Sequence, residues 1–320
     1  MTPLVVVMAA GGILGVAAPL VLGRLERLDR APQTAAYLWI MATVGALSAV
    51  VLAGLLLLVG SSRLLGDLAV LLSTCTMALR AALDAPTGTP GPLLGLALFA
   101  LVAGGLLGGG LIAGTRAWRA ARGQRELLTL AGRTQPGLPG VTVLDHPVPL
   151  AYCLPGRVGR RPGPVVITTA TLEQLEPAQL QAVLAHERAH QARRHHALLL
   201  VAQALGIGFP WLPAARAAHT AVARLVELAA DDAAVDRHAP ADVAIALAKL
   251  AVTPAPTLGL GASGPTTIER VRRLTTPPSS GPGGALWFAG LLVVVPLVAE
   301  LVAMATPLLR VAGTPVCPIT

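Results

Sequence analysis

The sequence predicts a membrane protein that is mainly α-helical, with four transmembrane helices and one small α+β domain between the third and the fourth of them. Two observations lead to this fold class. Of the 320 residues, 54% are hydrophobic and only 12% are charged, which is too apolar for an ordinary soluble enzyme. The apolar residues also gather in four segments, each long enough to cross a bilayer, which takes about 20 residues.

The four apolar segments are Pro3–Gly23, Ala35–Gly60, Leu93–Gly114 and Ala285–Leu309. The first three contain no charged residue, and the fourth contains only Glu300, an ionisable residue of a kind that is costly in a bilayer and often functional there. The first segment lacks the basic n-region and the clear cleavage site of a signal peptide, so we expect it to be retained. The chain is therefore expected to divide into a membrane domain (1–114), a second domain (115–284), a fourth span (285–309) and a short external tail (310–320).

Arginines near the ends of these segments predict the orientation. They lie between the first two segments, after the third and before the fourth: Arg24, Arg27, Arg30, Arg116, Arg119, Arg122, Arg125, Arg270, Arg272 and Arg273. By the positive-inside rule, residues 115–284 are cytoplasmic and the N-terminus is external, in a multi-pass protein of the cell membrane. The net charge of +8 then reflects topology and attraction to the lipid bilayer. Without interleaved aromatic residues it does not predict direct nucleic-acid binding.

The region 115–284 is expected to be the α+β domain, because short strand patterns come first and helical patterns follow. The expected elements are a basic helix at Thr115–Gly132, strands at Val141–Leu144, Leu150–Leu154 and Val165–Thr168, and helices at Thr171–Arg194, Ala214–His238 and Ala241–Ala251. A short basic helix follows between two linkers rich in Pro, Gly and Ser. An apolar stretch, Ala197–Pro213, is interrupted by Gly and Pro and is ambiguous.

Five consecutive residues, His186-Glu-Arg-Ala-His190, are the strongest functional signal in the chain. The stretch before them has helical periodicity, and a spacing of four then puts both histidines on one face of a helix, one turn apart. Two imidazoles so placed can bind one Zn²⁺ at about 2.0–2.1 Å, with Glu187 beside them as the general base for the zinc-bound water. A solvated polar helix that matches this pattern by chance is the alternative.

A site of this kind needs a third ligand, and the sequence offers two candidates. His196 has the third-histidine spacing of the metzincin motif, but Arg193 stands where that motif has the glycine that turns the chain back. In a continuing helix His196 would lie about 15 Å from His186. No methionine lies between Met77 and Met304, so a Met-turn is also excluded. We therefore reject the metzincin interpretation.

Glu227 is the second candidate, and Asp231 follows it one helical turn later in an Ala-rich context that favours a helix. This pair offers one carboxylate as a ligand and a second that can accept the free ring N–H of a ligand histidine. A solvated acidic face is the alternative. Two histidines and one carboxylate with an open fourth position are a standard catalytic zinc arrangement. The set can form only if Ala197–Pro213 makes no net crossing and is instead buried, re-entrant or at the membrane surface.

Seven short segments between Val141 and Leu274 carry a family resemblance. They are Asp145–Gly156, Val165–Thr169, Leu180–His190, Arg194–His196, Phe209–Pro213, Glu227–Val235 and Ile268–Leu274. Together they resemble the BlaR–MecR family of membrane metallopeptidases, and the order of the spans agrees. The related HtpX and CAAX-protease family shares the HExxH and ExxxD motifs and stays an alternative.

The resemblance implies a gluzincin-type zinc peptidase domain, with Zn²⁺ bound by His186, His190 and Glu227 and with Glu187 as the base. It also implies a protein substrate, such as a winged-helix repressor of the BlaI type, that is cleaved in regulatory signalling. The chain departs from the antibiotic sensors because only residues 310–320 follow the fourth span, so no external β-lactam sensor domain is expected. Two other function classes stay open: an HtpX-like quality-control protease and a catalytically silent signalling scaffold.

Some secondary expectations concern the substrate and the remaining polar groups. An extended substrate is expected to add to an edge strand, for which Leu150–Leu154 is the candidate. Four side chains are candidates for a donor to the transition state, although each is more often a solvated helix residue: Arg216, His219, Arg237 and His238. Cys153 is expected only to pack, and Cys75 and Cys317 could pair outside the cell. The sequence carries no signal for an oligomeric state.

Overall fold

The computed structural model of the chain describes residues 2–59, 90–156, 163–251, 267–276 and 283–312. Four of its long helical stretches are long and apolar enough to cross a membrane by length and composition: Pro3–Leu22, Pro32–Leu58, Leu93–Ala131 and Gly284–Ala303. They contain α1 (Thr2–Gly12) with α2 (Ala18–Leu22), α3 (Pro32–Val59), α5 (Pro90–Ala131) and α12 (Gly283–Ala312). Each of them overlaps one of the four apolar segments expected from the sequence.

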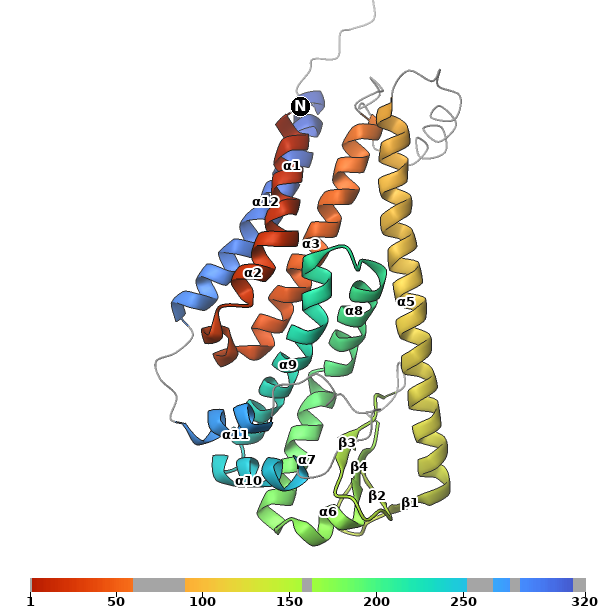
Figure 1. Ribbon diagram of the computed structural model, residues 1–320, viewed down its shortest axis with the longest axis vertical. Helices are drawn as coiled ribbons and strands as arrows, with labels where there is room; N and C mark the ends of the chain where they lie inside the picture. The colour runs from red at the N-terminus through yellow and green to blue at the C-terminus, as the bar shows by residue number, and fades with distance from the viewer. Residues whose placement is uncertain (1, 60–89, 157–162, 252–266, 277–282, 313–320) are drawn as a thin grey trace, which may run out of the picture.

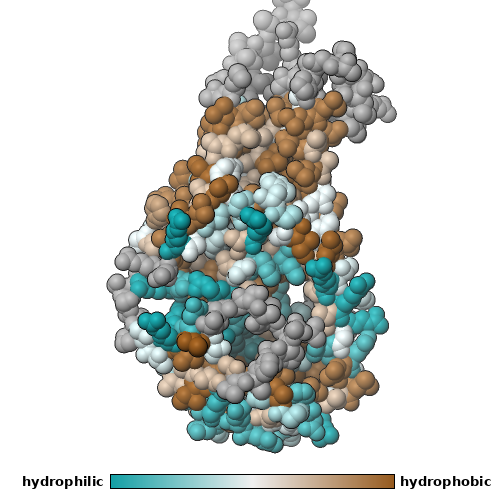
Figure 2. Space-filling view, in the orientation of Figure 1, coloured by the Kyte–Doolittle hydropathy of each residue, from teal (hydrophilic) through white to brown (hydrophobic). Residues whose placement is uncertain are grey.

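The long helices lie side by side, and the smaller elements gather at one end of them (Figure 1). The N-terminus, the end of α3 and the start of α5 lie at the opposite end of the molecule. Figure 2 shows apolar surface over the long helices and polar side chains around the other end. Large apolar side chains on the long helices stay exposed, such as Leu107 at 74% and Leu301 at 70%. Soluble monomers rarely expose large contiguous apolar patches, so an apolar surface over several long helices supports a membrane protein.

α5 runs without a break from Pro90 to Ala131, past the end of the apolar segment at Gly114. The domain boundary expected between residues 114 and 115 falls inside this helix. No proline interrupts residues 110–120, and the helix continues from its apolar part into its arginine-rich part. This helix thus connects the apolar helices directly to the sheet, which begins at β1 (Gly132–Thr134).

The ambiguous stretch Ala197–Pro213 forms one arm and the turn of a helical hairpin. α8 (His195–Gly208) and α9 (Pro213–Val235) pack against each other and insert between α3 and α5 (Figure 1). α8 approaches α5 closely enough that a Cβ at Gly109 would lie 2.2 Å from the carbonyl oxygen of Ala204. The chain therefore enters the apolar helices and returns to the same end. A hairpin that returns to the same end is compatible with a site shared by residues before and after this stretch.

The sheet has four strands in the order β1-β2-β4-β3. β2 (Val141–Leu144) and β4 (Val165–Thr168) have the expected bounds and pair in parallel, while β3 (Ala151–Cys153) pairs antiparallel with β4. β1 was not expected, because Gly-Arg-Thr carries no strand pattern and is held by its antiparallel pairing with β2. Among the described residues, β3 is an edge strand, as the sequence analysis anticipated for Leu150–Leu154.

The helix expected at Thr171–Arg194 is divided into α6 (Thr169–Gln174) and α7 (Pro177–Ala192). Pro177 lacks an N–H and suits the first turn of a new helix, and Glu176 with Gln179 forms a capping box around it. One face of α7 packs on the sheet through Leu184, which is completely buried among side chains of β2, β3 and β4. α10 (Pro240–Ala251) and α11 (Thr267–Thr275) complete this end of the molecule.

Glu300 on α12 is buried against α3, where its Oε2 accepts a hydrogen bond from Ser48 at 2.5 Å. A hydrogen bond between helices is the usual way to hold an ionisable side chain among apolar helices. The expectations for Cys75 and Cys317, and for residues 313–320 of the tail, lie outside the described residues. Residues 310–312 belong to α12.

Candidate active site

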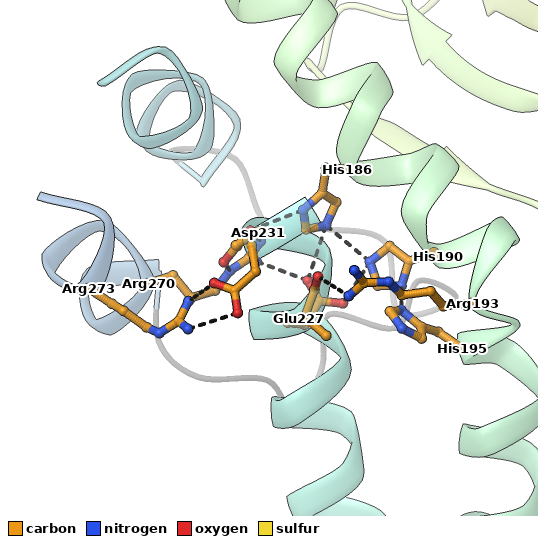
Figure 3. A network of polar contacts seen from close by, with 10 residues as sticks. His186, His190, Arg193, His195, Glu227, Asp231, Arg270 and Arg273 are labelled. Atoms are coloured by element: carbon orange, nitrogen blue, oxygen red, sulfur yellow. Dashed lines mark hydrogen bonds and ion pairs between the residues drawn. The ribbon is translucent and has the colours of Figure 1, made fainter. Parts of the chain in front are cut away.

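The HERAH motif lies on α7, and packing on two sides fixes the direction of its side chains. Since Leu184 faces the sheet, His186 and His190 face α9 instead (Figure 3). At the end of α7, the Arg193 guanidinium donates a 2.9 Å hydrogen bond to the carbonyl oxygen of Ala229 on α9. Before the motif, Ala182 and Ala185 of α7 share a buried cluster with Ala234 of α9, so the two helices are held together on both sides of the motif.

His186, His190 and Glu227 converge at the contact between α7 and α9. The Nε2 atoms of the two rings lie 3.1 Å apart, and the Glu227 carboxylate lies 3.6 Å from His186 Nε2 and 3.5 Å from His190 Nε2. All three side chains are nearly buried, with exposed fractions of 9%, 3% and 8%. Of the described residues, these three form the one group whose possible metal-ligand atoms all lie within 4.8 Å of one another.

These distances fit a zinc site. In a tetrahedral site with bonds of about 2.0–2.1 Å, neighbouring ligand atoms lie about 3.3–3.4 Å apart. The three observed separations fall on both sides of that value. Two neutral imidazoles and one carboxylate are also the donor set of many catalytic zinc sites. The residues therefore fit the metal in both geometry and chemistry.

The charges of the site also favour a cation. Burial lowers the pKa of His186, but contacts with Asp231 and Glu227 outweigh burial and raise this pKa to about 10. Burial would raise the pKa of Glu227, yet its contact with His186 and the charges around it hold the pKa well below its usual range. Burial lowers the pKa of His190. A cluster that retains a proton so strongly between its carboxylates provides a favourable place for a metal cation.

Asp231 lies one turn after Glu227 on α9 and contacts the other side of the His186 ring. Its Oδ1 lies 3.0 Å from His186 Nδ1, at ion-pair distance although outside hydrogen-bond alignment. Asp231 is completely buried. Burial would raise its pKa, but hydrogen bonds from Arg270 and the contact with His186 lower it, so the carboxylate stays charged. It lies where it can orient the His186 ring.

Glu187 is buried beside the metal-ligand candidates, and burial raises the pKa of its carboxyl. The thiol of Cys153, on β3, interacts with it, and burial and the nearby Glu187 charge raise the pKa of that thiol. Cys153 was expected only to pack. Its position shows that strand β3 runs past Glu187, so the edge of the sheet borders the candidate site.

Arg270 on α11 contacts the site and Arg273 lies beside it. From the sequence, both were expected only as topology signals and as part of the resembling segment Ile268–Leu274. Arg270 contacts Oε2 of Glu227 at 3.0 Å and Oδ1 of Asp231 at 2.6 Å. Arg273 binds Asp232 at 2.6 Å and donates to the backbone oxygen of Asp29. The signal available was the i, i+3 spacing of two arginines opposite two adjacent aspartates.

His196 is not part of the cluster, but a continuing helix is not the reason. α7 does not continue to His196; it ends at Ala192, and Arg194 adopts a left-handed conformation with φ 53°. The turn brings the next residue, His195, back against His190, with their Nδ1 atoms 2.9 Å apart. His195 is completely buried and was not expected in the site.

The four residues considered as transition-state donors do not join the cluster. In the described part of the chain, no side-chain hydrogen bond or ion pair connects any of them to the candidate ligands; they are Arg216, His219, Arg237 and His238. Arg270 is the positive group at the site, and the Glu227 and Asp231 carboxylates engage its guanidinium.

Comparison with known proteins adds two similarities. Residues 116–208 match the model of peptidase family M48. The chain is also 41% identical over 71 residues to protease HtpX homolog 1 of Streptomyces coelicolor. That stretch is 22% of this chain and 22% of the relative, so the match spans about a fifth of either protein. No solved structure gives a significant match.

These similarities support the HtpX and M48 relationship and do not confirm the BlaR–MecR subtype. The family match contains α7 with both histidines, the whole sheet and α8, and it ends before Glu227. Together with the long apolar helices, the two matches support a membrane metallopeptidase.

Proposed function

We propose that the protein is a zinc-dependent endopeptidase of the cell membrane, with His186, His190 and Glu227 as the metal ligands and Glu187 as the general base. The convergence of three ligand atoms from α7 and α9 within 4.8 Å carries this proposal. The charged state of Glu227 and the completely buried Asp231 behind His186 support it further. An assembled and buried donor set also argues against a catalytically silent scaffold.

The chain's own groups divide the chemistry among them. A Zn²⁺ ion in this site would supply Lewis acidity that polarises a scissile carbonyl and lowers the pKa of water. Glu187 accepts the proton of the attacking water and delivers it to the leaving amine. Burial raises the pKa of Glu187 toward the working pH, which suits a residue that must both take and release a proton.

The free edge of β3 is the proposed binding place for an extended substrate. β3 pairs with β4 on one side, and no described strand pairs with its other side. Its last residue, Cys153, lies beside Glu187, so a segment added along this edge would pass the general base. Backbone hydrogen bonds of this kind bind a chain with little dependence on its side chains.

For the substrate, we favour membrane proteins handled by an HtpX-like quality-control protease. The similarity to protease HtpX homolog 1 and to family M48 favours this class over cleavage of a winged-helix repressor. The test is a proteomic comparison between cells that carry the wild-type protein and cells that carry Glu187→Ala. Many fragments of membrane proteins that disappear in the variant would support quality control. A single lost fragment from a small DNA-binding protein would support the repressor instead.

The orientation is proposed to be cytoplasmic for the site and external for the N-terminus, on the basis of the arginine bias. In a background without native cysteines, we expect Arg188→Cys and Asp236→Cys to resist a membrane-impermeant thiol reagent in intact cells. Both positions are exposed, on α7 and directly after α9. Gly88→Cys, between α3 and α5, is expected to react. Labelling of Arg188→Cys and Asp236→Cys with protection of Gly88→Cys would reverse the orientation and exclude a cytosolic substrate.

A further inference from the structure

His195 and Gln33 form a short hydrogen-bonded chain that ends on His190. The left-handed turn at Arg194 places the completely buried His195 ring against His190, with Nδ1 facing Nδ1 at 2.9 Å. On the other side of the ring, Nε2 of His195 lies 2.9 Å from Oε1 of Gln33. Gln33 is the second residue of α3, so this chain connects the candidate metal site to the start of a long apolar helix. Figure 3 shows His195 below His190, on the side away from Asp231.

The direction of these hydrogen bonds follows from the chemistry of the rings. A neutral histidine that binds a metal through Nε2 carries its proton on Nδ1, which is then a donor. Nδ1 of His195 must therefore accept from His190. The proton of His195 is then on Nε2, where it is donated to Oε1 of Gln33. With Nε2 of His190 facing a metal, each group in the chain has a compatible donor or acceptor role.

Each candidate ligand histidine has a polar group beside its Nδ1, although only the contact of His190 has hydrogen-bond alignment. Nδ1 of His186 contacts Asp231 at 3.0 Å, and Nδ1 of His190 contacts His195 at 2.9 Å. Both rings consequently present Nε2 toward Glu227. Fixing the second ring nitrogen is the general means by which proteins set the tautomer and orientation of a ligand histidine.

Gln33 provides an independent observation. Its Nε2 is buried and has no hydrogen-bond partner among the described residues, while its Oε1 contacts His195. A buried amide that leaves two N–H groups unsatisfied is unfavourable, and an apolar side chain would avoid that cost. The hydrogen bond to His195 is the polar contact that the amide makes there.

We propose that His195 and Gln33 are positioning residues that fix the tautomer and orientation of His190 for metal binding. This inference rests on the proposed function, since it requires His190 to be a ligand. His195 does not touch the metal, and Gln33 acts only through His195. The metal site is thereby built partly from α3, which lies outside the stretch that matches family M48.

The test measures Zn²⁺ affinity by competition with a chromophoric chelator, on the full-length protein in detergent, together with the thermal midpoint of the metal-free form. His195→Ala is expected to weaken Zn²⁺ binding about 10–100-fold, as is typical for the loss of such a partner. His195→Asn keeps an acceptor for His190 and should restore most of the affinity. Gln33→Leu should weaken binding less than His195→Ala, and the double variant should be no weaker than His195→Ala alone. His196→Ala, a change at the neighbouring histidine, should bind like the wild type.

The outcomes separate this inference from the proposed function. If His190→Ala loses zinc while His195→Ala and Gln33→Leu bind it with wild-type affinity, the positioning role is wrong and the ligand set stands. If His190→Ala keeps zinc, both fail. A purely structural His195 would lower the thermal midpoint of the metal-free protein without changing its affinity for Zn²⁺. Should His195→Ala not fold, His195→Asn and Gln33→Leu decide the question.

Discussion

Replacement of Glu187 by glutamine is expected to remove most proteolysis while Zn²⁺ stays bound. The side chain keeps its size and one acceptor oxygen but can no longer accept a proton from water. General-base contributions of this kind are worth about 10²–10⁴-fold in rate. Cleavage of a denatured protein such as casein by the purified protein in detergent measures the effect, and elemental analysis measures the metal.

The matched control is Glu173→Gln, which makes the same chemical change at an exposed carboxylate on α6. It should cleave at the wild-type rate. Glu187→Gln protein that cleaves casein as fast as the control would exclude Glu187 as the base. A loss of zinc in Glu187→Gln would instead mean that this carboxylate helps to hold the metal.

The long helices, two of the strands and the spacing of the site residues could be predicted, because each depends on a pattern within a short stretch of sequence. Apolar runs of about 20 residues predicted the long helices, and short β-branched runs predicted β2 and β4 with the observed bounds. The four-residue spacing of His186 and His190 placed both rings on one face of a helix, and the ExxxD spacing placed Asp231 one turn after Glu227. In these cases the period of an element alone determines which side chains share a face.

Two other features depended on contacts that no local pattern reports. Arg270 reaches Asp231 across 39 residues of sequence, and His195 meets Gln33 across 162. The turn that brings His195 to His190 uses a left-handed Arg194, where a glycine or an asparagine would be the usual signal. The continuing helix assumed for His196 was therefore wrong, although the structure also leaves His196 out of the ligand cluster.

The ion pairs of the α11 arginines also could not be predicted from a local sequence pattern. The positive-inside rule assigned its arginines to topology, whereas two of them form buried or partly buried ion pairs with α9. Arg273 also donates to the backbone of Asp29, and Arg224 of α9 pairs with the Asp29 carboxylate. The connection between the first two apolar helices is thus tied to α9, which carries Glu227 and Asp231, and to α11, whose arginines pair with the acidic residues of α9.

Removal of any one proposed ligand is expected to have the largest effect on metal binding. His186→Ala, His190→Ala and Glu227→Ala should each weaken Zn²⁺ binding by more than about 100-fold, beyond the range seen when only a hydrogen-bonding partner is lost. Such a loss should leave the purified protein without stoichiometric zinc and without activity on casein. Glu227→Ala also removes a carboxylate oxygen that pairs with Arg270. The thermal midpoint of this variant must therefore be measured together with its metal content.

Asp231 and Asp232 provide the finer comparison, because both are aspartates of α9 paired with an arginine of α11. Only Asp231 contacts a proposed ligand, through Nδ1 of His186. Asp231→Asn should therefore weaken Zn²⁺ binding about 10–100-fold, whereas Asp232→Asn should leave it unchanged. Equal effects of the two variants would show that the ion pairs with α11, and not the orientation of His186, control metal binding.

Full zinc content in Glu227→Ala would show that the third ligand is another residue, and the carboxylate between the two histidines would need a different role.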